Sequence, residues 1–231
     1  MNVWEGVMKD RTVSRQAGDL LFLIGAVVAL SYLAAPRVEL IFPEGPSWKA
    51  AGIVTLGLYA VTRRSWLAAA ALFASAIGDV MLELEPPNMV GGMGAFGLAH
   101  VFYIAAFAGY LRRDAIRPLG VGLAVMVLAV SIAMLVWFLP DMGKLTVPGL
   151  GYQAIITAMV ITAMLSSAPL MTRIGAVIFM ISDSLIALGL YKHTPAPEES
   201  VWITYAIAQI LLARGFSEAT RANLLRAESR S

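Results

Sequence analysis

The chain contains no cysteine and few charged residues. The absence of cysteine excludes a disulfide framework, thiolate catalysis and a zinc site built from thiolates. Charged residues make up only 14% of the 231 residues, whereas a soluble domain has roughly 25%. Hydrophobic residues make up 59%, and the mean hydropathy is +0.76. This composition indicates an integral membrane protein and leaves no room for a soluble domain of useful size.

Eight apolar stretches approach the length that a membrane-spanning helix needs, and each is bounded by proline, glycine or charge. They cover residues 19–35, 47–62, 66–84, 92–111, 117–139, 147–166, 171–191 and 199–214. The second and the eighth are the shortest and carry polar residues. The sequence therefore predicts an all-α bundle of about eight transmembrane helices over residues 19–214. Residues 1–18 form a polar N-terminal segment, and the polar tail 215–231 has the pattern of a short surface helix.

The basic residues are distributed unevenly between the two sides that eight spans define. The N-terminal segment, the loops after the second, fourth and sixth spans, and the tail carry 13 of the 17 Lys and Arg residues. The other side has four, namely Arg37, Lys49, Lys144 and Lys192. Cytoplasmic loops are enriched in Lys and Arg. We therefore expect a multi-pass protein of a bacterial inner membrane with both termini in the cytoplasm.

Two aspartates lie inside these apolar stretches. Asp79 follows Ala76-Ile77-Gly78 in the third stretch, and Asp183 follows Met180-Ile181-Ser182 in the seventh. A carboxylate at mid-membrane depth costs roughly 2.5–3.5 kcal/mol even on lenient insertion scales, so packing does not explain it. We predict that Asp79 and Asp183 are functional residues of a polar site enclosed by the helices.

The similar surroundings of the two aspartates raise the hypothesis of an internal duplication. They are 104 residues apart, in the third and the seventh of eight spans. A duplication of four spans plus four would place them at equivalent positions, and both halves would cross the membrane in the same direction because four is even.

Other polar residues fall at a similar depth in the predicted helices, in the outer half of the membrane. His100 and Tyr103 share one helix face, as do Tyr205 and Gln209, because they are three and four residues apart. We expect polar residues from five spans to line one shared cavity with the two aspartates. The candidate substrate-binding residues are His100, Tyr103, Glu83, Asn88, Tyr152, Ser182, Tyr205 and Gln209.

The residues by themselves leave three kinds of chemistry open. Apolar surroundings and a neighbouring carboxylate both favour the neutral form of an acid, so one aspartate can hold a proton while the other is ionised. Such a pair suits acid–base hydrolysis of an acid-labile bond. It equally suits a proton or cation relay in a transporter. The third option is a Zn or Mn ion bound by the two aspartates and His100.

The segments around these residues resemble the YhhN family of membrane proteins, which includes the transmembrane lysoplasmalogenases. The resemblance covers nearly the whole chain. Its motifs, in chain order, are Ile77-Gly78-Asp79-Val80-Met81-Leu82, His100-Val101-Phe102-Tyr103-Ile104, Phe179-Met180-Ile181-Ser182-Asp183-Ser184 and Tyr205-Ala206-Ile207-Ala208-Gln209.

This resemblance implies hydrolysis of the vinyl-ether bond of a lysoplasmalogen, which yields a fatty aldehyde and a glycerophospho-ethanolamine or -choline. One aspartate would act as the acid, and the other would stabilise the cation and activate water. The implied partners are a lysophospholipid substrate and membrane lipids, with no nucleic acid, and the chemistry requires no metal or organic cofactor. A membrane transporter that uses the same aspartates as a relay is the alternative.

Overall fold

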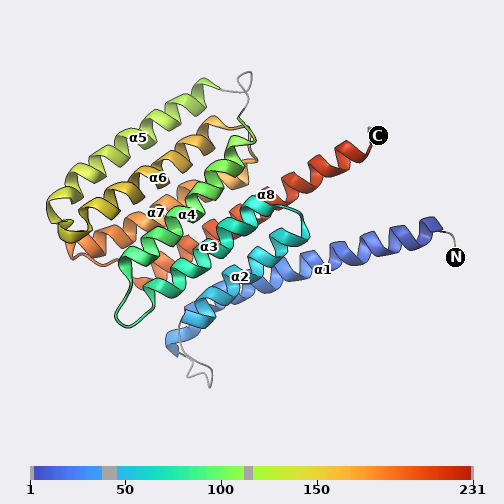
Figure 1. Ribbon diagram of the computed structural model, residues 1–231, viewed down its shortest axis with the longest axis horizontal. Coiled ribbons are helices and arrows are strands. Elements are labelled where there is room, and N and C mark those ends of the chain that lie inside the picture. Colours follow the sequence, from blue (N-terminus) through green and yellow to red (C-terminus); the bar gives the residue numbers. More distant parts are fainter. Residues whose placement is uncertain (1–2, 38–45, 112–116, 230–231) are drawn as a thin grey trace.

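Helices dominate the computed structural model, which describes residues 3–37, 46–111 and 117–229 (Figure 1). No strand occurs within these ranges. The eight α-helices are α1 (Val3–Ser31), α2 (Pro46–Thr62), α3 (Trp66–Leu82), α4 (Met89–Ala108), α5 (Pro118–Phe138), α6 (Thr146–Leu165), α7 (Leu170–Lys192) and α8 (Glu198–Glu228). Short 3₁₀ helices follow α1 and α5; they are η1 (Tyr32–Arg37), η3 (Leu139–Asp141) and η4 (Gly143–Leu145). The predicted all-α bundle of eight helices is confirmed.

Local sequence signals explain several of the helix ends. The side chain of Asn88 accepts a hydrogen bond from the backbone N–H of Gly91 at 2.9 Å, so Asn88 caps the N-terminus of α4. Pro118 occupies the first turn of α5, where its missing N–H costs nothing. After Lys192, His193 adopts a left-handed conformation with φ of 52° and ends α7. These punctuating residues are the reason that most helix ends fall close to the predicted spans.

Helix α8 extends beyond the predicted end of the eighth span. It continues without a break from residue 214 to Glu228, so the segment 215–231 does not begin a separate surface helix. Phe216 is 2% exposed and Ser217 is fully buried, so the first turn of the continuation packs in the core of the bundle, whereas residues 222–229 are exposed. The physical reason is that charged residues end an apolar stretch but do not end a helix, and this segment contains no proline.

Within the described residues, five helices are long and apolar enough, by length and composition alone, to cross a membrane. They lie at Gln16–Ala34, Met89–Ala108, Pro118–Asp141, Gly143–Leu165 and Leu170–Lys192. Helix α3 is apolar but has 17 residues. Helices α2 and α8, which the sequence predicts as the shortest and most polar spans, also fall outside this set. The protein is a multi-pass membrane protein.

The helices of the first half and the second half have matching neighbours. Helix α3 packs against α2 and α4, and α7 packs against α6 and α8. Helix α4 packs against α6, and α8 packs against α2. Shifting each helix number by four converts these relations into one another, whereas the contacts of α8 with α3 and α1 have no equally extensive counterpart between α4 and α7 or α5. The duplication therefore stays a prediction. Figure 1 shows both termini at the same end of the bundle. Three of the basic residues counted for that end, Arg112, Arg113 and Arg230, lie outside the described residues.

Small residues allow the inner helices to approach closely, as is common in membranes. Helix α3 buries five alanines among its neighbours, Ala68, Ala69, Ala71, Ala74 and Ala76. At the α1–α2 contact, a Cβ on Gly52 would lie 2.5 Å from the backbone nitrogen of Ala29, so this position requires glycine. The close packing of α3 with its neighbours determines which faces of the aspartate-bearing helices meet.

Candidate active site

Asp183 lies at the centre of a hydrogen-bonded group contributed by three helices. The hydroxyl of Tyr152, on α6, donates a hydrogen bond to the Asp183 carboxyl on α7. The Nε2 atom of His100, on α4, is 3.1 Å from the Tyr152 hydroxyl and 3.6 Å from Asp183 Oδ2. His100 is fully buried, whereas the Asp183 side chain is 14% exposed. The three groups are close enough to share a proton, and Asp183 has access to the space beside them.

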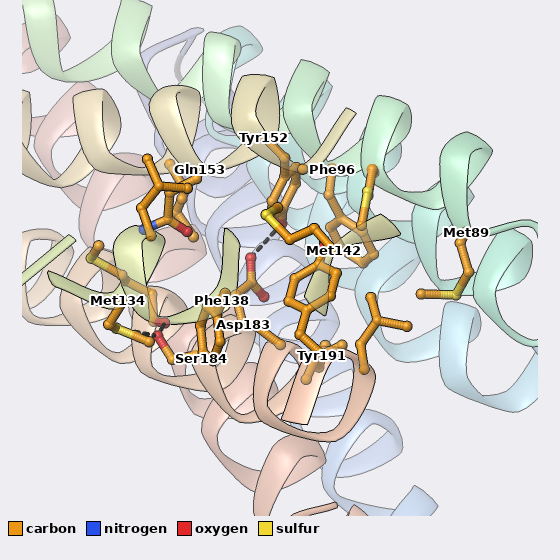
Figure 2. Close-up of a pocket in the computed structure, with 18 of the residues that line it drawn as sticks. Met89, Phe96, Met134, Phe138, Met142, Tyr152, Gln153, Asp183, Ser184 and Tyr191 are labelled. Atoms are coloured by element: carbon orange, nitrogen blue, oxygen red, sulfur yellow. Dashed lines mark hydrogen bonds between the residues drawn. The ribbon is translucent and has the colours of Figure 1, made fainter. Parts of the chain in front are cut away.

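That space is a cavity, and Figure 2 shows Asp183 and Tyr152 on its wall. Helices α4, α5, α6 and α7 supply most of the lining, with Leu82 from the end of α3. The lining is mainly apolar, and five of the protein's twelve methionines contribute to it, namely Met89, Met93, Met134, Met142 and Met180. The cavity volume is about 70 Å³. A bound lipid chain would therefore displace some of these flexible side chains.

Asp79, on α3, belongs to a second group, which lies between α3 and α8. Its carboxyl accepts a hydrogen bond of 2.7 Å from the hydroxyl of Tyr205 on α8, and its side chain is 3% exposed. One helical turn further on, Glu83 forms an ion pair of 2.5 Å with Lys49 of α2. Asp79 does not line the cavity around Asp183. The structure thus places the two aspartates in two neighbouring groups, not on the wall of one cavity.

Aromatic side chains connect the two groups. The Phe179 ring is 4.8 Å from the His100 ring and 5.4 Å from the Tyr205 ring, measured between centroids. Phe96 packs against both Phe179 and Tyr205 and also lines the cavity. The groups around Asp79 and Asp183 are therefore packed together through these rings.

The two groups are related by the same four-helix shift as the bundle. Asp79 on α3 pairs with Tyr205 on α8, and Asp183 on α7 lies beside His100 on α4. Each aspartate thus lies beside a side chain from the helix that directly follows the other aspartate's helix. The cavity of Figure 2 adjoins Asp183.

Four further candidates bond to groups other than the two aspartates. Tyr103 donates a hydrogen bond of 2.7 Å to the amide oxygen of Gln209, which ties α4 to α8 within the core. Ser182 donates to the backbone oxygen of Val201 at 3.0 Å, which ties α7 to α8. Asn88 caps α4, as described above. These residues join or cap helices and do not contact either aspartate by hydrogen bonding.

Some functional candidates were not predicted from the sequence. Lys49 is one, because its position in the sequence indicates only a basic residue near a membrane surface. Gln153 is another; it lines the cavity and donates a hydrogen bond of 2.7 Å to Ser131 on α5. Gln153 could have been identified from its position directly after Tyr152 in an otherwise apolar span. No signal in the sequence pairs Lys49 with Glu83, since they lie on different helices.

The metal hypothesis requires Asp79, Asp183 and His100 to converge on one point. His100 and Asp183 are adjacent, but Asp79 bonds to Tyr205 in the other group. Within the residues that the structure describes, no three His, Cys, Asp or Glu side chains form a group that could hold a metal ion. Asp79, Asp183 and His100 are therefore not arranged to bind one Zn or Mn ion together.

Comparison with known proteins places the chain in a family. The YhhN family model matches residues 45–216. A lysoplasmalogenase of Mycobacterium bovis is 38% identical over 182 residues, which cover 74% of this chain and 69% of the relative. The mouse lysoplasmalogenase TMEM86B is 28% identical over 181 residues, covering 73% of this chain and 76% of the relative. No solved structure matches the chain. The chain belongs to the YhhN family.

Proposed function

We propose that this protein is a lysoplasmalogenase-like hydrolase. Its substrate would be the vinyl-ether bond of an alkenyl-glycerophospho-ethanolamine or -choline, and its products a fatty aldehyde and the glycerophospho-alcohol. The observation that carries this proposal is the group formed by Asp183, Tyr152 and His100 on the wall of an apolar cavity. Relatives that are named lysoplasmalogenases support the same substrate class.

The cavity suits a single-chain lipid. Its lining is apolar along α5 and α7, where an alkenyl chain can pack, and polar at Asp183 and Tyr152. Methionine side chains adapt their shape to a bound chain more readily than branched or aromatic residues do. A lipid whose chain occupies this space would bring its first carbon atoms, which carry the vinyl ether, close to the acidic group.

Asp183 is the acid in the proposed mechanism. It transfers its proton to the β-carbon of the vinyl ether, which converts the double bond into an oxocarbenium ion. The resulting carboxylate stabilises this cation and accepts a proton from the attacking water. The hemiacetal formed in this step collapses to the aldehyde and the alcohol, so one water molecule is consumed. Tyr152 and His100 orient the carboxyl, and Asp79 stabilises the cation from the second group.

A transporter is less well supported than a hydrolase. Relay sites in transporters are typically built from broken helices, whose free backbone groups contact the solute. Here α3 and α7 continue without interruption past Asp79 and Asp183.

The protein would lie in a bacterial inner membrane with both termini in the cytoplasm, and lipid would enter from the outer leaflet.

Aldehyde release from defined lipids tests the proposed function. Purified protein in detergent would be given an alkenyl-lysophospholipid and, in parallel, the lysoacyl and diacyl analogues, which lack the vinyl ether. We expect aldehyde from the alkenyl lipid and no turnover of the two analogues. Absence of aldehyde under conditions in which the protein is folded and binds the lipid would refute the hydrolase assignment.

A further inference from the structure

A cage of aromatic rings and a carboxylate surrounds the ammonium group of Lys49. Its Nζ atom is 5.6 Å from the centroid of the Tyr32 ring and 5.3 Å from that of Trp202. The same nitrogen forms the 2.5 Å ion pair with Glu83. Trp202 is held in place by a hydrogen bond of 2.7 Å from its indole N–H to the backbone oxygen of Ala29. Three helices and η1 thus converge on one cation.

This arrangement has the chemistry of a binding site for ammonium ligands. Electron-rich ring faces attract cations, and aromatic cages bind choline-like groups in this way. A nearby carboxylate adds a charge-assisted partner. In the structure, the cage formed by Tyr32, Trp202 and Glu83 is occupied by the protein's own Lys49.

The other lysine pair at this end of the bundle differs in the number of rings and in exposure. Lys192 forms an ion pair with Asp141 and lies over one ring, that of Trp137. Asp141 is 45% exposed, whereas Glu83 is 28% exposed, although the two lysines themselves are equally exposed, at 19% and 20%. Lys192 therefore lacks the second ring and the more buried carboxylate, and it provides a matched control for Lys49.

The cage is adjacent to both parts of the proposed active site. Glu83, which forms the ion pair with Lys49, is one helical turn, about 6 Å, from Asp79 along α3. Glu83 also directly follows Leu82, which lines the cavity, and the next helix begins with Met89, which lines it as well. A lipid with its chain in the cavity can therefore reach the cage across the end of α3.

We propose that Tyr32, Trp202, Glu83 and Lys49 bind the zwitterionic headgroup of the lipid substrate. The ligand's ammonium group would replace that of Lys49 in the cage, and Lys49 would move to the ligand's phosphate. This inference rests on the proposed function for the identity of the lipid, a phosphoethanolamine or phosphocholine lysolipid.

Charge balance favours the exchange. Breaking an ion pair by removing one partner leaves an uncompensated charge, which is costly away from water. A zwitterionic headgroup avoids this cost, because its ammonium pairs with Glu83 while its phosphate pairs with Lys49. A lipid that lacks either charge would leave one of the two side chains without a partner. The site is therefore selective for a headgroup that carries both charges.

Binding of non-hydrolysable ether lipids tests this proposal independently of turnover. The affinity of the purified full chain in maltoside detergent would be measured for 1-alkyl-glycerophosphoethanolamine and for 1-alkylglycerol, which has no headgroup. We expect Lys49→Gln to weaken binding of the phospholipid about tenfold, the loss expected for one charge-assisted contact. The affinity for alkylglycerol should stay unchanged, and Lys192→Gln should change neither.

A second substitution tests the ammonium side of the cage. Glu83→Gln should weaken binding of the phosphoethanolamine lipid but not of 1-alkylglycerophosphate, which has no ammonium. If the Lys49→Gln protein does not fold, the Glu83→Gln comparison tests the headgroup site by itself. Equal losses for charged and uncharged lipids, or no loss with either variant, would overturn the headgroup site. Headgroup-dependent binding without aldehyde release from the alkenyl lipid would instead overturn the proposed hydrolase and leave the headgroup site standing.

Discussion

Asp183 combines three properties that are rare in a membrane helix. It is ionisable, it accepts a hydrogen bond from a half-buried tyrosine, and it faces an apolar cavity. An intramembrane carboxyl is costly to bury, and its partners Tyr152 and His100 come from two other helices, so its position depends on the folded bundle. A residue of this kind supports chemistry more readily than it supports packing.

Neutralising either aspartate should abolish turnover without unfolding the protein. Asparagine has the size of aspartate and can still accept the tyrosine hydrogen bond, but it is not an acid. We expect Asp183→Asn to lower the rate of aldehyde release about 10²–10⁴-fold, the usual contribution of a general acid or base. Asp79→Asn should also abolish turnover, since it removes the second carboxylate.

Thermal unfolding separates the catalytic role of these aspartates from a packing role. Asparagine cannot ionise, so it carries no desolvation cost of a buried charge, and both variants should be at least as stable as the parent protein. Asp141→Asn, at an exposed pair with Lys192, serves as the control and should retain activity. Near-normal turnover in a folded Asp183→Asn protein would contradict the proposed role of that residue.

Two tyrosines that each donate a side-chain hydrogen bond between helices provide a comparison at the same scale, one half-buried and one fully buried. Tyr152 bonds to Asp183, whereas Tyr103 bonds to Gln209. Tyr152→Phe should reduce kcat about tenfold or more, because the carboxyl loses its orienting hydrogen bond. Tyr103→Phe should affect mainly stability, with kcat close to that of the parent. Steady-state kinetics and unfolding temperatures of both variants check this, and the reverse pattern would place the active group around Tyr103.

At the scale of the helices, close approach of backbones determines where the side chains of the two acidic groups lie. The contact between α1 and α2 leaves no space for a side chain at Gly52, and α2 carries Lys49 towards α3. A change in this contact would therefore shift the cage around Lys49 as well as weaken the bundle.

Gly52→Ala should be markedly destabilising. The added Cβ would lie 2.5 Å from the Ala29 backbone nitrogen and 2.6 Å from its Cα, so one helix must move. We expect a loss of about 1–3 kcal/mol, as for other overpacked positions, measured as a lower unfolding temperature in detergent. Gly122→Ala on α5, where no atom lies within 4 Å, is the control and should be neutral. Equal stability of the two variants would show that α1 and α2 separate without cost.

At the scale of the whole molecule, the even number of helices brings both termini to one end of the bundle (Figure 1). That end also carries most of the basic residues in the sequence. The C-terminal ends of α3 and α7 lie on the opposite side of the bundle (Figure 1). The cage around Lys49 and the Lys192–Asp141 pair are at these helix ends. The orientation of the protein therefore decides which leaflet supplies the substrate.

We predict that both termini are cytoplasmic. A C-terminal fusion to a reporter that functions only in the cytoplasm should be active, and a fusion to a reporter that requires export should be inactive. A reporter inserted between α3 and α4 should show the reverse. The opposite result would place the cage on the cytoplasmic side and reverse the proposed direction of lipid entry.

The sequence alone determined the membrane class, the number of helices and most of their ends. These follow from local properties, namely apolar length, proline, glycine and charge, which do not depend on neighbouring helices. The exceptions are α1, which begins at Val3 and not at the predicted residue 19, and α8, which continues to Glu228. In both segments the charged residues that end the apolar stretch do not end the helix. The two aspartates were also identifiable from the sequence, because their cost in a membrane is a property of each residue.

Only the tertiary structure decided which of the polar residues meet. Equal depth in the membrane predicted one cavity shared by five spans, but depth does not specify which way a helix is rotated. The rotation of α3 turns Asp79 and Glu83 towards α8 and α2, while Gly78 and Leu82 face α4. That rotation is set by the packing of small residues between helices, and it separates the group around Asp79 from the cavity at Asp183.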